Sequence, residues 1–126
     1  MVETDYSPQW QNDDADDDDV FELRIYHTQP GKRDLLDARF RDHTIRLFAK
    51  HGMQSVGYWH PIDGPDAENT LIYILKHESR DAAKASWAAF GQDPEWKKVA
   101  AESGVGRLAQ RPESIYMRAT DYSPIK

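Results

Sequence analysis

The chain has 126 residues, of which 39% are hydrophobic and 30% are charged; its formal net charge is −6, and it contains no cysteine. This length accommodates one small domain, and the lack of cysteine excludes disulfides, zinc ribbons, iron–sulfur clusters and thiol catalysis. No run of about 18 apolar residues exists, which excludes a membrane-spanning helix. The apolar stripe of the first helix is needed for the core, so we expect no membrane insertion. No signal peptide is visible, so we expect a cytoplasmic protein.

The acidic charge is concentrated near the N-terminus. Residues 1–19 hold eight of the 22 acidic residues and no Lys or Arg, so the remainder of the chain is nearly neutral. We therefore expect an acidic N-terminal leader over residues 1–19 and a folded domain over residues 20–126. A nearly neutral domain does not neutralise phosphates, so we expect no nucleic-acid partner. The tetrapeptide Asp-Tyr-Ser-Pro occurs near both ends. We expect its tyrosines to dock on the folded domain, Tyr122 in its own subunit and Tyr6 on a neighbouring one.

The order of apolar patterns predicts the fold. Period-two alternation predicts strands over residues 20–27, 53–60, 70–77 and 113–120. Helical spacing predicts a helix over residues 32–51, a second from Ser79 to about Phe90, and a short third helix capped by Asp93. The resulting β-α-β-β-α-β order predicts an α+β, ferredoxin-like domain: a four-stranded antiparallel sheet with helices on one face.

The strand patterns also predict which residues share a face. Alternation in the first strand separates the apolar set Phe21, Leu23 and Ile25 from a polar set. Two helices cover only one face of such a sheet, so we expect the apolar set to meet them. The opposite face is then expected to carry Glu22, Arg24, Tyr26, Tyr116 and Arg118.

The apolar pattern of the third strand predicts that a second copy of the domain packs on the sheet. Residues 71–75 are apolar at every position, as in a strand buried on both faces. A single copy of the domain has nothing to cover the second face. We therefore expect a homodimer in which two sheets close face to face into a dimeric α/β barrel, the alternative being a monomer with an exposed aromatic face.

Three candidates for chemistry stand out. His43 falls on the apolar stripe of the first helix, where it would serve as a general base or haem ligand, or as a buried structural histidine. Arg24 and Tyr26 would clamp an anion and transfer a proton, or belong to a structural Glu–Arg network that keys the dimer. Four aromatic residues would line a substrate slot, or serve only in packing: Trp59, Trp87, Phe90 and Trp96.

These candidates define the expected site. The catalytic candidates are His43, Arg24 and Tyr26. The expected binding pocket comprises Arg24, Tyr26, Trp59, Tyr73, Trp87, Tyr116 and Arg118. No metal-ligand spacing occurs among the five histidines, so we expect neither a metal nor a cofactor.

Several segments, in order, resemble the NIPSNAP family over roughly residues 20–124. They are Glu22-x-Arg24-x-Tyr26 followed by Pro30-Gly31, then Gly57-Tyr58-Trp59, a Gly64-Pro65 loop with Asn69 ahead of the third strand, and Asp93-Pro94-Glu95-Trp96. The resemblance implies a dimeric α/β-barrel fold.

The resemblance implies no agreed activity. The wider superfamily includes cofactor-free monooxygenases that act on aromatic polyketides, haem-degrading enzymes and isomerases of small lactones. We therefore expect a protein that binds a small hydrophobic or aromatic molecule between sheet and helices, as a cofactor-independent monooxygenase or isomerase. The alternative is a non-catalytic homodimeric interaction module. An enclosed cavity with converging polar groups would favour the enzyme, and a filled core the module.

Overall fold

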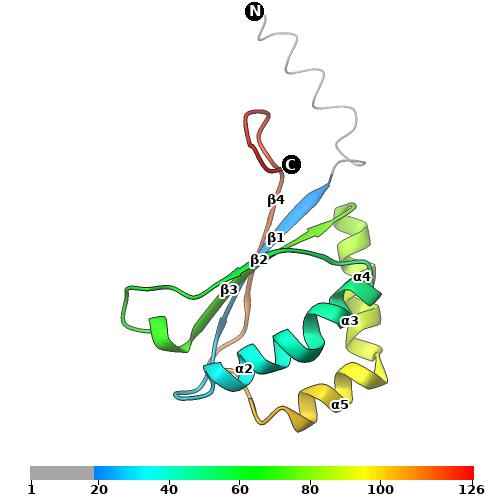
Figure 1. The fold of residues 1–126 in the computed structure, drawn as a ribbon. Coiled ribbons are helices and arrows are strands. Elements are labelled where there is room, and N and C mark those ends of the chain that lie inside the picture. Colours follow the sequence, from blue (N-terminus) through cyan, green and yellow to red (C-terminus); the bar gives the residue numbers. More distant parts are fainter. Residues whose placement is uncertain (1–18) are drawn as a thin grey trace, which may run out of the picture.

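The computed structural model describes residues 19–126, which form a four-stranded antiparallel sheet with strand order β2-β3-β1-β4. Helices α2–α3, α4 and α5 lie together on one face of the sheet (Figure 1). The strands are β1 (Val20–His27), β2 (Gln54–Trp59), β3 (Thr70–His77) and β4 (Glu113–Met117). The helical segments are α2 (Arg33–Arg39), η2 (Phe40–Thr44), α3 (Ile45–Lys50), η3 (Ala67–Asn69), α4 (Arg80–Gln92) and α5 (Pro94–Glu102). The predicted ferredoxin-like α+β fold is confirmed.

Local sequence explains where the helices begin and end. The Ser79 hydroxyl accepts a hydrogen bond from a backbone amide of the first turn of α4, at 2.9 Å. Asp93 caps α5 in the same way at 2.8 Å, and Pro94 occupies the first helical position, where no amide donor is needed. The first helix stops at Gly52, whose φ of 83° is readily adopted only by glycine.

Asp93 also ties the first helix to the last. Its Oδ2 accepts hydrogen bonds from Lys50 Nζ at 2.8 Å and from His51 Nε2 at 2.7 Å. The Lys50 and His51 contacts and the capped amide hold the pKa of the Asp93 carboxyl well below its usual range. One carboxylate therefore caps α5 and fixes it against the end of α3.

The first helix contains a wide π-helical turn. Segments α2, η2 and α3 are continuous, and in η2 the backbone bonds span five residues instead of four. The extra residue rotates everything after it by about 100°. Thr44 is therefore buried, with its hydroxyl bonded to the Arg39 carbonyl at 3.2 Å, whereas His43 is exposed. The expectation that His43 faces the sheet is wrong for this reason.

The expected assignment of the two sheet faces is also wrong. Glu22, Arg24 and Tyr26 point toward the helices: Trp87 Nε1 of α4 donates to Glu22 at 2.8 Å, and the Arg24 guanidinium lies 4.2 Å from the centre of the Trp87 ring. Both faces of this sheet carry apolar residues, so hydropathy alone does not distinguish them. The longer side chains of the polar set fill the space beneath the helices, and their polar ends are paired there.

A buried carboxylate lies at the centre of this layer. Glu22 is fully buried, and its Oε1 accepts from His77 Nε2 at 2.9 Å and from Trp87 Nε1 at 2.8 Å. Its Oε2 accepts from Arg24 Nη1 at 2.9 Å and from Ser114 Oγ at 2.6 Å. Burial by itself raises the pKa of Glu22, but these four donors outweigh it and lower the pKa to about 2.

The opposite face of the sheet carries a row of apolar side chains. Leu23 of β1 pairs with Ile74 of β3 and Ile115 of β4, and Ile25 pairs with Ile72. No described helix packs on this side (Figure 1), and Ile115 is 51% exposed. We call these five residues the open sheet face. An apolar surface of this kind on a monomer is a candidate contact surface.

The C-terminal end of the chain is largely exposed. Tyr122 is 82% exposed, so the expectation that it docks on the domain is wrong. The expected leader, apart from Asp19, and its Tyr6 lie outside the described residues. Within residues 19–126, no helix has the length and apolar character needed to cross a bilayer.

We expect the stability of the domain to depend on pH through Glu22. The pKa of Glu22 is below its usual value of 4.5, so its stabilising effect is complete above pH 4.5 and is lost as the pH falls toward 2. Urea unfolding at pH 7 should show Glu22→Gln to be less stable than wild type by about 3 kcal/mol. At pH 3 the gap should shrink markedly, and an equal gap at both pH values would contradict this assignment.

Candidate functional site

A groove of about 360 Å³ opens beside edge strand β2, between that strand and the first helix. The helix supplies its residues from α2, the π-helical turn and the start of α3, and the sheet supplies the rest. The lining residues are Asp37, Phe40, Arg41, Ile45, Tyr58, Trp59, His60 and Leu71. Apolar and aromatic side chains form most of this surface, with three polar groups among them, as is common for sites that bind small molecules.

The polar groups of the groove include a His–Asp pair. His60 Nε2 lies 3.0 Å from Asp37 Oδ1 and 2.9 Å from Oδ2. The carboxylate accepts, so Nε2 carries the proton that joins the pair, and Nδ1 is left for another group. Arg41 contributes an exposed positive charge to the same groove. The pair thus orients an imidazole beside an aromatic surface.

The aromatic wall depends on a glycine in β2. The indole of Trp59 folds back along the strand, and a Cβ at Gly57 would lie 2.6 Å from the ring. A larger residue would therefore displace Trp59. Next to it, Tyr58 donates or accepts a 2.7 Å hydrogen bond with the Ser55 hydroxyl, and burial raises the pKa of the Tyr58 phenol.

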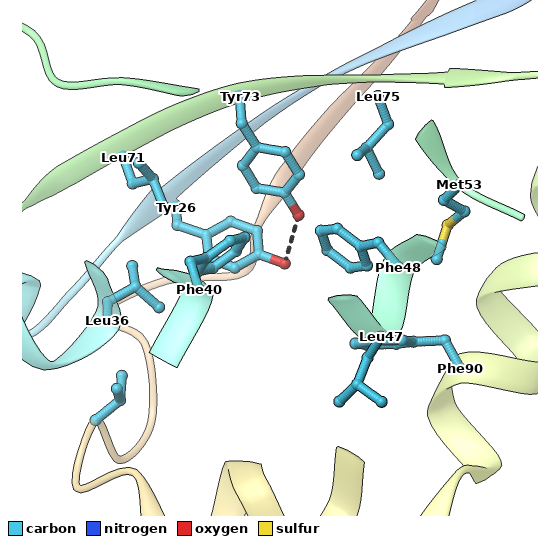
Figure 2. Packing of buried hydrophobic residues seen from close by; sticks show 11 residues of the cluster. Tyr26, Leu36, Phe40, Leu47, Phe48, Met53, Leu71, Tyr73, Leu75 and Phe90 are labelled. Carbon is cyan, nitrogen blue, oxygen red and sulfur yellow. Dashed lines mark hydrogen bonds between the residues drawn. The ribbon is translucent and has the colours of Figure 1, made fainter. Parts of the chain in front are cut away.

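A second polar group lies deeper, between the sheet and the helices. Arg24 Nε donates to the Tyr73 hydroxyl at 3.0 Å, and Arg24 Nη2 donates to the Tyr26 hydroxyl at 3.3 Å. The two hydroxyls point at each other and are 2.9 Å apart (Figure 2). Burial and the neighbouring Tyr26 hold the pKa of Tyr73 well above its usual range. The Tyr73 phenol therefore stays protonated at neutral pH.

Aromatic rings connect the groove with this tyrosine pair. The centre of the Phe40 ring lies 5.1 Å from that of Tyr73 and 5.9 Å from that of Tyr26, and both contacts are edge to face. Tyr58 stacks on Tyr73 at 5.2 Å. The groove wall is therefore separated from the buried hydroxyls by a single layer of rings, and Figure 2 shows Phe40 beside the pair.

The predicted site residues fall into separate places. Arg24, Tyr26, Tyr73 and Trp87 meet between sheet and helices, although on the face opposite to the one expected for Arg24 and Tyr26. Tyr116 lies apart from these four residues: its ring packs against the Arg80 guanidinium, whose Cζ is 3.7 Å from the ring centre.

The remaining three predicted residues do not join that group. Trp59 lines the groove, and His43 is exposed on the π-helical turn. Arg118 is exposed just beyond the end of β4.

Sequence reasoning did not identify the polar residues of the groove. Asp37 and His60 are 23 positions apart, and only the packing of the first helix on β2 brings them together. The Gly57-Tyr58-Trp59 segment was the available signal, since it borders His60. The described residues contain no cluster of three His, Asp or Glu side chains able to hold a metal ion.

Comparison with known proteins agrees with this architecture. No curated protein matches the chain significantly. A NIPSNAP-like domain protein from Burkholderia xenovorans is 19% identical with a TM-score of 0.74, over 86% of this chain and 90% of that one. A NIPSNAP family protein of unknown function from Agrobacterium tumefaciens is 22% identical with a TM-score of 0.75, over 87% and 96% of the two chains.

A more distant structure shares the fold. SnoaB, a cofactor-independent oxygenase from Streptomyces nogalater, is 17% identical with a TM-score of 0.55, over 85% of this chain and 98% of its own. At this level of identity the likeness concerns the fold alone. The family model for NIPSNAP matches residues 21–124, nearly the whole described domain. The chain therefore belongs to the NIPSNAP family.

Proposed function

We propose that this NIPSNAP protein is a homodimer that binds a small hydrophobic or aromatic molecule in the groove beside β2. The single observation that carries the proposal is the groove itself: about 360 Å³, walled by Phe40, Tyr58 and Trp59 and bordered by the Asp37–His60 pair. Flat rings pack well against such walls, while the polar groups select orientation. The oriented imidazole also supplies a general base, as cofactor-independent oxygenation or isomerisation of such a molecule would require.

The open sheet face supports the dimer. Its five residues, Leu23, Ile25, Ile72, Ile74 and Ile115, form one contiguous apolar surface across three strands. Burying it against a second copy would remove this surface from water at about 25 cal/mol per Å². A two-fold axis places the same patch on both sides of the interface, so the surface needs only to complement itself.

A second function is favoured by one observation. The space between sheet and helices is filled: Tyr73 is fully buried, and Phe40, Phe48, Trp87 and Phe90 pack into one aromatic cluster around it. A filled centre is what a non-catalytic homodimeric interaction module would need. The two functions differ in whether the groove is ever occupied.

Light scattering at micromolar concentration should give the mass of a dimer. Ile74→Lys places a charge in the middle of the open sheet face and should give a monomer with an unchanged circular dichroism spectrum. Ala88→Lys, at an exposed position of α4, is the matched control and should stay dimeric. A monomeric wild-type protein would contradict the dimer.

Thermal-shift screening against neutral aromatic alcohols, quinones and amides should yield compounds that raise the melting temperature. Ile45→Trp fills the groove and should abolish those shifts, whereas Ile62→Trp, at a loop position that is 91% exposed, should preserve them. If no compound binds while the dimer persists, the interaction module is the better description.

A further inference from the structure

Two groups that line the groove have no partner among the residues that the structure describes. The first is Nδ1 of His60, whose other ring nitrogen, Nε2, lies 3.0 Å and 2.9 Å from the two carboxylate oxygens of Asp37. Because Nε2 carries the hydrogen that Asp37 accepts, Nδ1 of the neutral ring presents a lone pair. The second is the guanidinium of Arg41, which has no ion pair or hydrogen bond with a described residue. The groove therefore offers a ligand one acceptor and one cation.

The other titratable groups of the groove are already engaged. Both oxygens of Asp37 face His60 Nε2. The Tyr58 hydroxyl is paired with Ser55 Oγ at 2.7 Å, and burial raises the pKa of this phenol, so it supplies no negative charge. The remaining lining residues are uncharged: Phe40, Ile45, Trp59 and Leu71. The polar atom of a ligand must therefore match His60 Nδ1 and Arg41.

The chemistry of these two groups selects among ligand atoms. A lone pair needs a donor, whereas a guanidinium needs an acceptor. An ammonium group donates to His60 Nδ1, but its charge is repelled by Arg41. A carboxylate accepts from Arg41, but it places its own lone pairs against Nδ1. A hydroxyl meets both needs, and the aromatic walls favour a hydroxyl that is carried by a flat ring.

We propose that the groove binds phenols, with the ring against Tyr58 and Trp59 and the hydroxyl between His60 and Arg41. This inference rests on the proposed function and names its class of ligand. The volume of about 360 Å³ is near the lower end for small-molecule sites, which suits a ligand of one or two rings.

The same arrangement promotes ionisation of the bound hydroxyl. The phenol O–H bond breaks, the proton forms an N–H bond at His60 Nδ1, and the electron pair stays on the phenolate oxygen. Opposite charges then alternate along the carboxylate of Asp37, the imidazolium of His60, the phenolate and the guanidinium of Arg41, and the net charge is unchanged. Asp37 is a positioning residue, because it orients the imidazole and stabilises the imidazolium without touching the ligand.

The first test compares a phenol with its methyl ether. 7-Hydroxycoumarin and 7-methoxycoumarin are titrated separately into the full-length protein at pH 7 and constant ionic strength, by calorimetry. The hydroxyl compound should bind roughly tenfold more tightly, since the ether has no hydrogen to donate. His60→Phe should remove this preference, whereas His43→Phe, at an exposed position outside the groove lining, should keep it.

Absorbance gives a second readout, because neutral and ionised 7-hydroxycoumarin absorb at different wavelengths. On the protein, the pH at which half of the probe is ionised should fall by about one unit, which corresponds to tenfold tighter binding of the anion. Arg41→Gln should abolish this shift, and Arg111→Gln, an exposed arginine outside the groove lining, should keep it. Asp37→Asn should reduce the shift but leave binding of the methyl ether unchanged, as expected for a residue that acts through His60.

The outcomes separate this inference from the proposed function. Equal binding of the two compounds, with no change in the ionisation of the hydroxyl, would overturn the phenol site and leave the groove as a site for neutral aromatic molecules. A preference for the phenol that survives Ile45→Trp would place the hydroxyl outside the groove and would also overturn the inference. Failure of both compounds to bind would overturn the phenol site, whereas the groove proposal would fall only if the wider thermal-shift screen also found no ligand.

Discussion

The fold is organised around the buried carboxylate of Glu22. Its two oxygens accept from β1, β3, β4 and α4, through Arg24, His77, Ser114 and Trp87. Each donor comes from a different element, so the carboxylate is satisfied only when three strands are in register and α4 lies across them. A buried charge tolerates few alternatives, since losing one donor leaves it poorly compensated. Burial of the apolar side chains between sheet and helices supplies most of the stability. Glu22 specifies the strand register and the position of α4 in which those side chains pack.

The sequence predicted the elements well and their orientation poorly. Periodicity located β1 and β3 with the correct bounds, and the caps at Ser79 and Asp93 were assigned correctly, because these features depend on nearby residues. Which side of β1 points toward the helices depends on the partners of Glu22. These partners, His77 and Trp87, are 55 and 65 residues away in the sequence, so the local pattern does not reveal them. The residues were therefore identified as a group, but on the wrong side of the sheet.

The site was predicted in part for the same reason. Arg24, Tyr26, Tyr73 and Trp87 were grouped from their chemistry, and the structure brings them together. The Asp37–His60 pair was not foreseen, since it arises where the first helix packs on β2. His43 was misplaced because regular α-helical spacing was assumed through a turn that is wider. Long-range packing and one irregular turn thus account for most of the differences.

The wide turn at Phe40–Thr44 also constrains how this gene can change. The first helix is fixed at both ends. Leu36 near its start is fully buried in the core, and Lys50 at its end is hydrogen-bonded to Asp93. Removing one codon within the turn would restore a regular helix and swing Leu47 and Phe48 out of the core by about 100°. At the tip of the loop between β2 and β3, Ile62 is 91% exposed, so a change of length there disturbs the core less. Insertions and deletions should therefore accumulate in that loop among relatives, while the spacing across the turn stays constant.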